Sequence, residues 1–153
     1  MKFNRPIAAA ALGALATLAG ELLSLAFVWA GVVETDSYRI DSLLITFNEQ
    51  CLFLGFVANF ITGGAIAVLL NWALSRYGAD WVVSKAIAAT LAGWFLLRLY
   101  ATAFLESQGA IAPPLAQYYV HLAGAVATGV ALGLLLKGLL HRGGAERQRS
   151  HAK

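Results

Sequence analysis

Four long apolar segments are the feature that most constrains what this chain can fold into. They cover residues 7–33, 51–75, 81–105 and 117–140. About 20 apolar residues suffice for a helix to cross a bilayer core, so each segment can cross with some tilt. A 153-residue soluble protein that is 59% hydrophobic and 12% charged would have too little interior to hide its apolar side chains. The sequence therefore predicts an all-α, polytopic membrane protein with four transmembrane helices.

The distribution of basic residues predicts the orientation. They gather before the first segment, around the link between the second and third, and after the fourth, whereas the other two links hold Arg39 alone among acidic residues. Four crossings put both termini on one side, and the positive-inside rule makes that side cytoplasmic. The net charge of +3 is concentrated at the two ends of the chain. This placement favours anionic membrane lipids as partners and argues against nucleic acid.

The first link contains the pattern of a short amphipathic helix. In "TDSYRIDSLLITFNEQ", residues 35–50, the apolar residues recur at i, i+3, i+4 and i+7, which is one face of a helix. The apolar positions are Ile40, Leu43, Leu44 and Phe47, the plausible N-caps are Thr35, Asp36 and Ser37, and the polar face carries Arg39, Asp41 and Glu49. We predict a helix over residues 37–48 lying on the outer membrane surface. The alternative is that the second span simply starts early, at Asp41.

The chain divides into a transmembrane bundle and a tail. The bundle is expected over residues 1–142, with the fourth span starting at Ala112-Pro113-Pro114 because proline is tolerated in the first turn of a helix. The first apolar run is longer than the roughly 7–15 residues of a signal-peptide core, so we expect it to be retained. Residues 143–153 contain a glycine pair, many charges and no apolar period, which predicts a cytoplasmic tail that is disordered or lies on the lipid headgroups.

Small residues mark the expected contacts between helices, since helices in lipid associate by close packing. They fall on one stripe of the first span, one stripe of the second, and a G-x-x-x-G pair in the fourth. The predicted packing residues are Gly13, Gly20, Gly63, Gly129 and Gly133. We interpret them as faces inside one bundle, with contact between two copies of the chain as the alternative for the pair in the fourth span.

Each span also contributes one strongly polar side chain to the outer half of the membrane. At about 1.5 Å per residue, Arg98, Asn59 and His121 lie roughly 6–12 Å from the outer end of their spans, and Glu21 lies roughly 18 Å deep. A charge facing lipid costs at least about 2.5–3.5 kcal/mol on insertion scales. We predict a Glu21–Arg98 ion pair, with Asn59 and His121 completing the hydrogen bonds. In the alternatives, Arg98 extends alone to the surface or stacks on Trp94, and Glu21 is protonated.

No motif in the sequence specifies a reaction. Zinc-binding H-E-x-x-H, C-x-x-C, G-x-S-x-G and glycine-rich phosphate loops are all missing. Haem held by two histidines of one bundle is not expected, because His121 and His141 lie at opposite ends of the fourth span. We therefore predict no catalytic residues, no metal site, no cofactor and a non-enzymatic protein.

One part of the chain resembles a known group of proteins. The segments "GGAIAVLLNWALSRYGADWVVSKAIAATLAGWFLLRLY" (63–100) and "HLAGAVATGVALGLLL" (121–136) resemble small uncharacterised bacterial membrane proteins. The matching positions are Gly78, Asp80, Lys85, Gly93 and Trp94, and the chain departs from the pattern at Ala86, where glycine is commoner. The resemblance implies four helices in the bacterial inner membrane and carries over no activity and no site residues.

Three functions remain, of which the third, an intramembrane enzyme, has the least support in the sequence. The first is a structural or accessory subunit that packs with itself, as a homo-oligomer, or with other membrane subunits. The second is an oligomeric transporter or channel in which Glu21 and Arg98 line a path, since four helices alone rarely enclose a pore.

Overall fold

The computed structural model describes residues 4–34, 36–46, 50–107 and 114–151, and every regular element in them is a helix. The elements are α1 (Arg5–Trp29), α2 (Ser37–Thr46), α3 (Leu52–Tyr77), α4 (Val82–Ser107) and α5 (Leu115–His151). All of these except α2 contain a segment long and apolar enough to cross a membrane. The prediction of an all-α protein with four candidate membrane-spanning helices is therefore confirmed.

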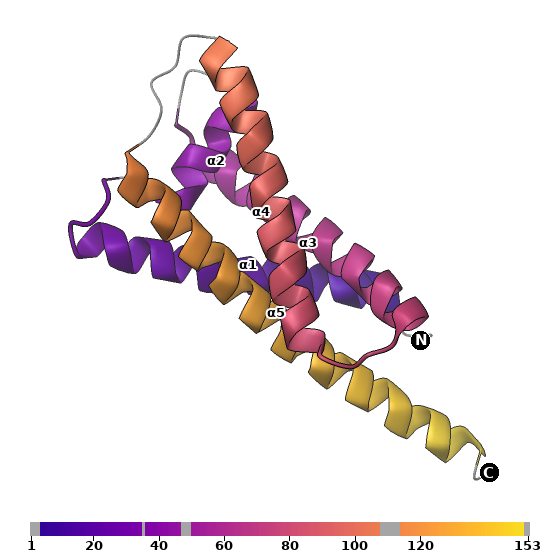
Figure 1. Cartoon of the computed structure of the whole chain (residues 1–153). Coiled ribbons are helices and arrows are strands. Elements are labelled where there is room, and N and C mark those ends of the chain that lie inside the picture. Colours follow the sequence, from indigo (N-terminus) through magenta and orange to yellow (C-terminus); the bar gives the residue numbers. More distant parts are fainter. Residues whose placement is uncertain (1–3, 35, 47–49, 108–113, 152–153) are drawn as a thin grey trace.

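The four long helices run between two distinct ends of the molecule (Figure 1). One end carries the start of α1, the link between α3 and α4, and the last turns of α5. The other, which we call the α2 end, carries the end of α1, the starts of α3 and α5, and the second half of α4. The long helices diverge toward the α2 end, and α2 lies among them (Figure 1). Helix α1 packs against both α3 and α5, and α5 packs against α4.

Glycine residues let the backbone of α1 come into direct contact with the backbones of α3 and α5. A Cβ on Gly13 would collide with the carbonyl oxygen of Gly63 in α3, and one on Gly20 would collide with Thr128 and the backbone of Gly124 in α5. These positions tolerate nothing larger than hydrogen. The predicted small-residue stripe of α1 thus faces the interior and joins three helices.

The glycine pair of α5 faces α4. A Cβ on Gly129 would meet Thr90 and the backbone of Ile87, and one on Gly133 would meet Val83. Both glycines are therefore occupied by a contact within the same chain. On the same helix, Leu132 and Leu136 are fully buried and belong to the main hydrophobic core.

Local hydrogen bonds fix where α2 begins and how it joins α3. Asp36 is the N-cap, since its Oδ1 accepts from the main-chain N–H of Arg39 at 2.8 Å. Ser42 is completely buried, and its hydroxyl accepts from the main-chain N–H of Cys51 at 2.9 Å. At Gly55 the backbone of α3 lies directly against the carbonyl of Tyr38, leaving no space for a side chain. Helix α2 is thus fastened along the first turns of α3.

Part of the predicted amphipathic face lies outside the description. This holds for the side chains of Ile40, Leu43 and Leu44, and for the whole of Thr35, Phe47, Asn48 and Glu49. The described residues still show one clear difference from the prediction. Asp41, expected on the solvated face, contacts Asn59 of α3 instead.

The link between α3 and α4 is short and conformationally demanding. Gly78 ends α3 with φ of 90°, a value that suits glycine, whereas Trp81 adopts φ of 57° with a bulky side chain. The Nζ of Lys85 donates to the carbonyl of Gly78 at 2.9 Å, so this lysine fastens the link as well as marking the start of α4.

Helix α5 begins after Pro114 and extends to His151. Ala112 and Pro113, the rest of the predicted start signal, lie outside the described residues. Beyond Gly143-Gly144 the helix contains Ala145, Glu146, Arg147, Gln148 and Arg149, which are good helix formers. The disordered cytoplasmic tail expected over residues 143–153 stays a prediction.

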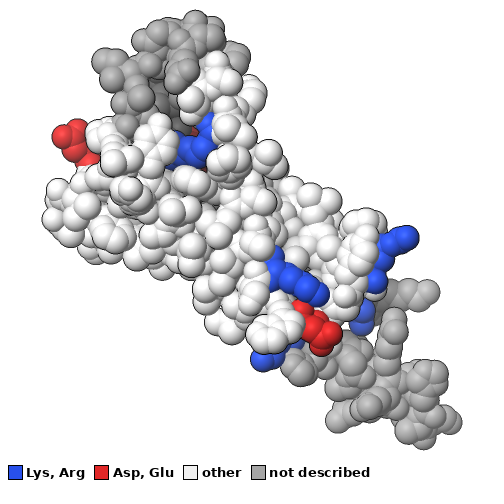
Figure 2. Space-filling view, viewed as in Figure 1, with Lys and Arg blue, Asp and Glu red and all other residues white. Residues whose placement is uncertain are grey.

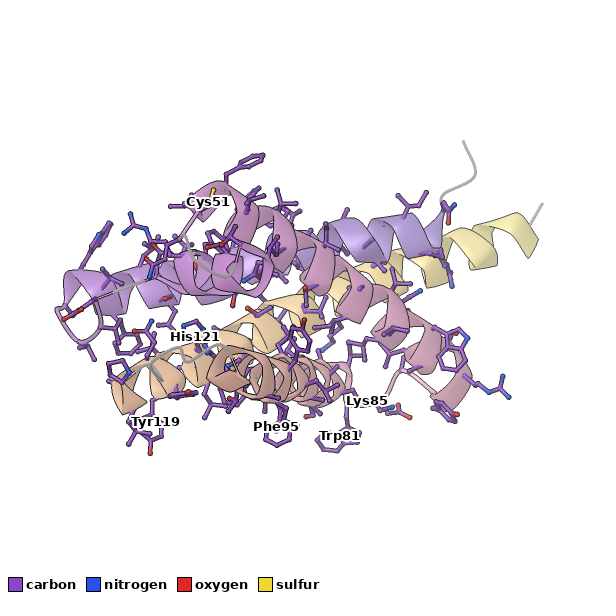
Figure 3. All side chains as sticks on the ribbon, turned by 90° about the horizontal axis from the view of Figure 1, so that it is seen from above. Cys51, Trp81, Lys85, Phe95, Tyr119 and His121 are labelled. Atoms are coloured by element: carbon purple, nitrogen blue, oxygen red, sulfur yellow. The ribbon has the colours of Figure 1, made fainter. Side chains whose placement is uncertain are left out.

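The outer surface is largely uncharged. Figure 2 shows a broad surface without charged side chains between groups of charges toward the two ends of this face. Trp81, Phe95 and Tyr119 point outward along one edge of the bundle in Figure 3. Large apolar side chains are exposed on all four long helices, including Leu22, Ile61, Leu96 and Leu134. Such a surface fits lipid, where exposed apolar groups cost nothing.

Candidate functional site

The four polar residues predicted to form one layer do not form a single cluster of paired side chains. Asn59 and Arg98 both interact with Asp41 of α2, and His121 lies near Arg98. Glu21 lies near Asp36, Tyr38 and Asp41 of the α2 region. The site is therefore built around α2.

Asp41 is the centre of the contacts between α2 and the long helices. Its Oδ2 accepts from Nδ2 of Asn59 in α3 at 2.8 Å. Burial raises the pKa of the Asp41 carboxyl from 3.8 to about 6, while the positive charge of Arg98 and the hydrogen bond from Asn59 act in the opposite direction. Desolvation outweighs both because it penalises the charged form of the carboxyl.

Arg98 lies between α2 and α5. Its guanidinium carbon stands 5.2 Å from the centre of the Tyr118 ring, a cation–π contact. Its charge also acts on Asp41 and on His121. Nη2 of Arg98 is buried without a hydrogen-bond partner among the described residues, as is Nε1 of Trp94 one turn earlier. The aromatic partner of Arg98 is therefore Tyr118 of α5, and not Trp94 of its own helix.

The predicted ion pair between Glu21 and Arg98 is not formed in the described structure. The carboxylate neighbour of Arg98 is Asp41. Glu21 is 6% exposed and lies near Asp36 and Asp41, and the main-chain N–H of Tyr38 donates to its carboxylate. The physical reason for the difference is that α2, packed against α3, places the carboxylate of Asp41 beside Arg98.

His121 faces the interior of the bundle (Figure 3). It is 6% exposed, and its Nε2 lies 3.4 Å from Nε2 of Gln117, one turn earlier in α5. The guanidinium of Arg98 is a cationic neighbour of this ring. Within the described residues, no group of three or more His, Cys, Asp and Glu side chains is placed to hold a metal ion.

The sequence reasoning missed three residues of this site: Tyr38, Asp41 and Tyr118. Periodicity placed Asp41 on the solvated face of a surface helix. One signal pointed the other way, because Asn59 and Arg98 within apolar spans both need polar partners. Asp41 is a carboxylate on the element that precedes α3, and it can serve both.

Comparisons with known proteins found no relative: no family model, no curated protein and no solved structure matches the sequence. What the protein does must therefore be inferred from its own geometry.

Proposed function

We propose that the protein is a non-enzymatic, multi-pass membrane protein of the bacterial inner membrane, with both termini in the cytoplasm. In this proposal it serves as a structural or accessory subunit that packs with itself or with a larger membrane complex. One observation carries the proposal. At Gly13 and Gly20 the backbone of α1 lies directly against α3 and α5, and such close packing supports a structural role over a path through a single copy.

The outward faces support the same proposal. Small side chains are exposed as well as large ones, including Ala88 and Ala92 on α4 and Ala11 on α1. Exposed small residues permit another helix to approach closely. The glycine pair of α5 is unavailable for such a contact because α4 already covers it.

The mass of the assembly in lipid tests this proposal. The full chain, extracted from membranes in polymer-bounded lipid discs, should have a defined mass larger than that of one chain. Ala92→Trp and Ala11→Trp are matched variants, because both positions face outward and neither change crowds the interior. Loss of assembly in one variant and not the other would locate the interface. A single chain per disc, with no second membrane protein in fixed stoichiometry, would contradict the proposal.

An oligomeric transporter or channel is the second candidate. It is favoured by the polar layer itself, since Oε2 of Glu21 and Nη2 of Arg98 are buried without hydrogen-bond partners among the described residues. Reconstituted liposomes carrying a pH-sensitive dye would test it. Proton or ion flux that is lost in Arg98→Gln would favour transport over a purely structural role.

A further inference from the structure

The buried charges at the α2 end do not balance. Asp36 is paired with Arg39, with Oδ2 and Nε 3.5 Å apart. Asp41 faces Arg98. Glu21 is left with two carboxylates in its surroundings, and none of the described cations acts on it. The described groups therefore leave one negative charge uncompensated inside the bundle.

The uncompensated carboxylate has an open coordination position. Oε2 of Glu21 is buried and has no hydrogen-bond partner in the described structure. An isolated carboxylate in an apolar interior is unfavourable, so such groups bind a counter-ion or take up a proton. The geometry thus calls for a positive charge at this oxygen.

A second buried oxygen lies next to it. Tyr38 is 6% exposed, and its hydroxyl interacts with Thr17 and lies near Glu21. Among the described residues no hydrogen bond of good geometry ends on this oxygen. The ring cannot easily turn away, because it stands edge-on to Phe56 at 5.6 Å and its main chain lies against Gly55. The α2 helix therefore holds the hydroxyl in place.

Thr17 supplies a third oxygen one turn before Glu21. Its Oγ1 donates to the carbonyl of Ala14 at 2.7 Å, which uses its proton and leaves its lone pairs free to accept. Carboxylate, phenol and hydroxyl oxygens suit a hard cation, and one excess negative charge suits a single positive one.

We propose that Glu21, Tyr38 and Thr17 form a binding site for one monovalent cation, a proton or a sodium ion, between α1 and α2. The site does not rest on the proposed role as a subunit. The cation completes the contact between α1 and α2, so its binding stabilises the folded chain.

Several other groups surround this site and titrate or carry charge. They are Asp36, Arg39 and Asp41 on α2, Arg98 on α4, and Tyr118 and His121 on α5, while α3 contributes the neutral Asn59. A pH effect alone would therefore not identify Glu21. The test must ask whether the effect disappears when the Glu21 carboxylate is removed.

The experiment measures the thermal unfolding of the full chain in lipid nanodiscs through its tryptophan fluorescence. In one arm NaCl replaces choline chloride at constant ionic strength and pH 8, and in the other the pH is varied from 5 to 8 without sodium. Glu21→Gln removes the charge and keeps the size, whereas Glu34→Gln removes the same charge from an exposed position and is the control. Binding to the folded state alone raises Tm in proportion to the logarithm of the ligand concentration above Kd.

A rise in Tm with sodium in the unmodified protein and in Glu34→Gln, but not in Glu21→Gln, would establish sodium as the cation. An absent sodium effect, with a Tm that falls as pH rises and a flatter profile in Glu21→Gln alone, would establish the proton. The proposal is overturned if Tm depends on neither cation or if Glu21→Gln keeps the full dependence. If Glu21→Gln does not fold, Tyr38→Phe is measured in its place. A several-fold higher sodium concentration at the midpoint of its Tm rise, or a displaced dependence of its Tm on pH, supports the site. Profiles of Tyr38→Phe that match those of the unmodified protein overturn the proposal.

Discussion

At the scale of single residues, the protein keeps ionisable groups inside an apolar bundle by giving each a specific neighbour. Arg98 has an aromatic ring on one side and a carboxylate on the other, and Asp41 has an amide donor. These contacts join α2, α3, α4 and α5. A substitution at one of these residues should therefore change the energetic effect of a substitution at its partner on the neighbouring helix.

We expect Asn59→Leu to destabilise the folded chain by about 1.5–3 kcal/mol at pH 8, because it removes a hydrogen bond to an ionised carboxylate. The cost should shrink in an Asp41→Asn background, where no charge is left without a donor. Unfolding in nanodiscs of the unmodified protein, the two single variants and the double variant would give the coupling free energy between Asn59 and Asp41. Equal costs of Asn59→Leu in both backgrounds would mean that the contact contributes nothing.

The same residue predicts a pH dependence with a definite sign. The pKa of Asp41 is raised to about 6 in the folded chain from an ordinary 3.8, so its protonated form favours folding. Its contribution to stability is full below about pH 3.8 and is lost as the pH rises through 6. Asp41→Asn should flatten this part of the profile, whereas Asp80→Asn, at an exposed position, should not.

At the scale of helices, stability depends on how closely backbones approach. Helix α1 meets α3 and α5 through glycine, and α5 meets α4 in the same way. In lipid the hydrophobic effect does not drive helices together, so these close contacts supply much of the attraction. Helix α2 adds hydrogen bonds to α3, and it does so only at the α2 end of the molecule.

Gly13→Ala should destabilise the bundle by about 1–3 kcal/mol, because the added methyl group would overlap the carbonyl of Gly63 and force α1 away from α3. Gly138→Ala is the matched control, since a Cβ there meets nothing within 4 Å and alanine favours a helix. Thermal unfolding of both variants in the same lipid makes the comparison. A neutral Gly13→Ala would contradict the packing described for α1.

At the scale of the whole molecule, α1 begins and α5 ends at the same end of the bundle (Figure 1). This is the arrangement that four membrane crossings would require. The basic residues of the sequence gather at that end too, including Arg5, Arg76 and Lys137.

We expect reporter fusions at the C-terminus and after Gly109 to report opposite sides of the membrane, with the C-terminal one in the cytoplasm. Alkaline phosphatase and a green fluorescent protein suit the two compartments. A C-terminal phosphatase that is active would reverse the orientation, and equal sidedness of both fusions would contradict four crossings.

The sequence by itself determined the features that depend on neighbouring residues. Hydropathy over about 20 residues specifies a candidate span, and a spacing of three or four residues puts Gly13 and Gly20 on one face of α1, so the four long helices and their small-residue stripes were predictable. Asp36 as the N-cap of α2 was among the predicted positions for the same local reason.

Only the tertiary structure decided which polar groups meet. Residues 39, 41 and 49 looked like one solvated face, but the close fit of Tyr38 against Gly55 turns Asp41 toward Asn59 and Arg98. Glu21 thereby loses Arg98 as its partner and faces the start of α2. Periodicity cannot foresee this, because it gives the face on which a side chain lies and not the helix that will cover it. That choice depends on backbone contacts between residues far apart in the chain.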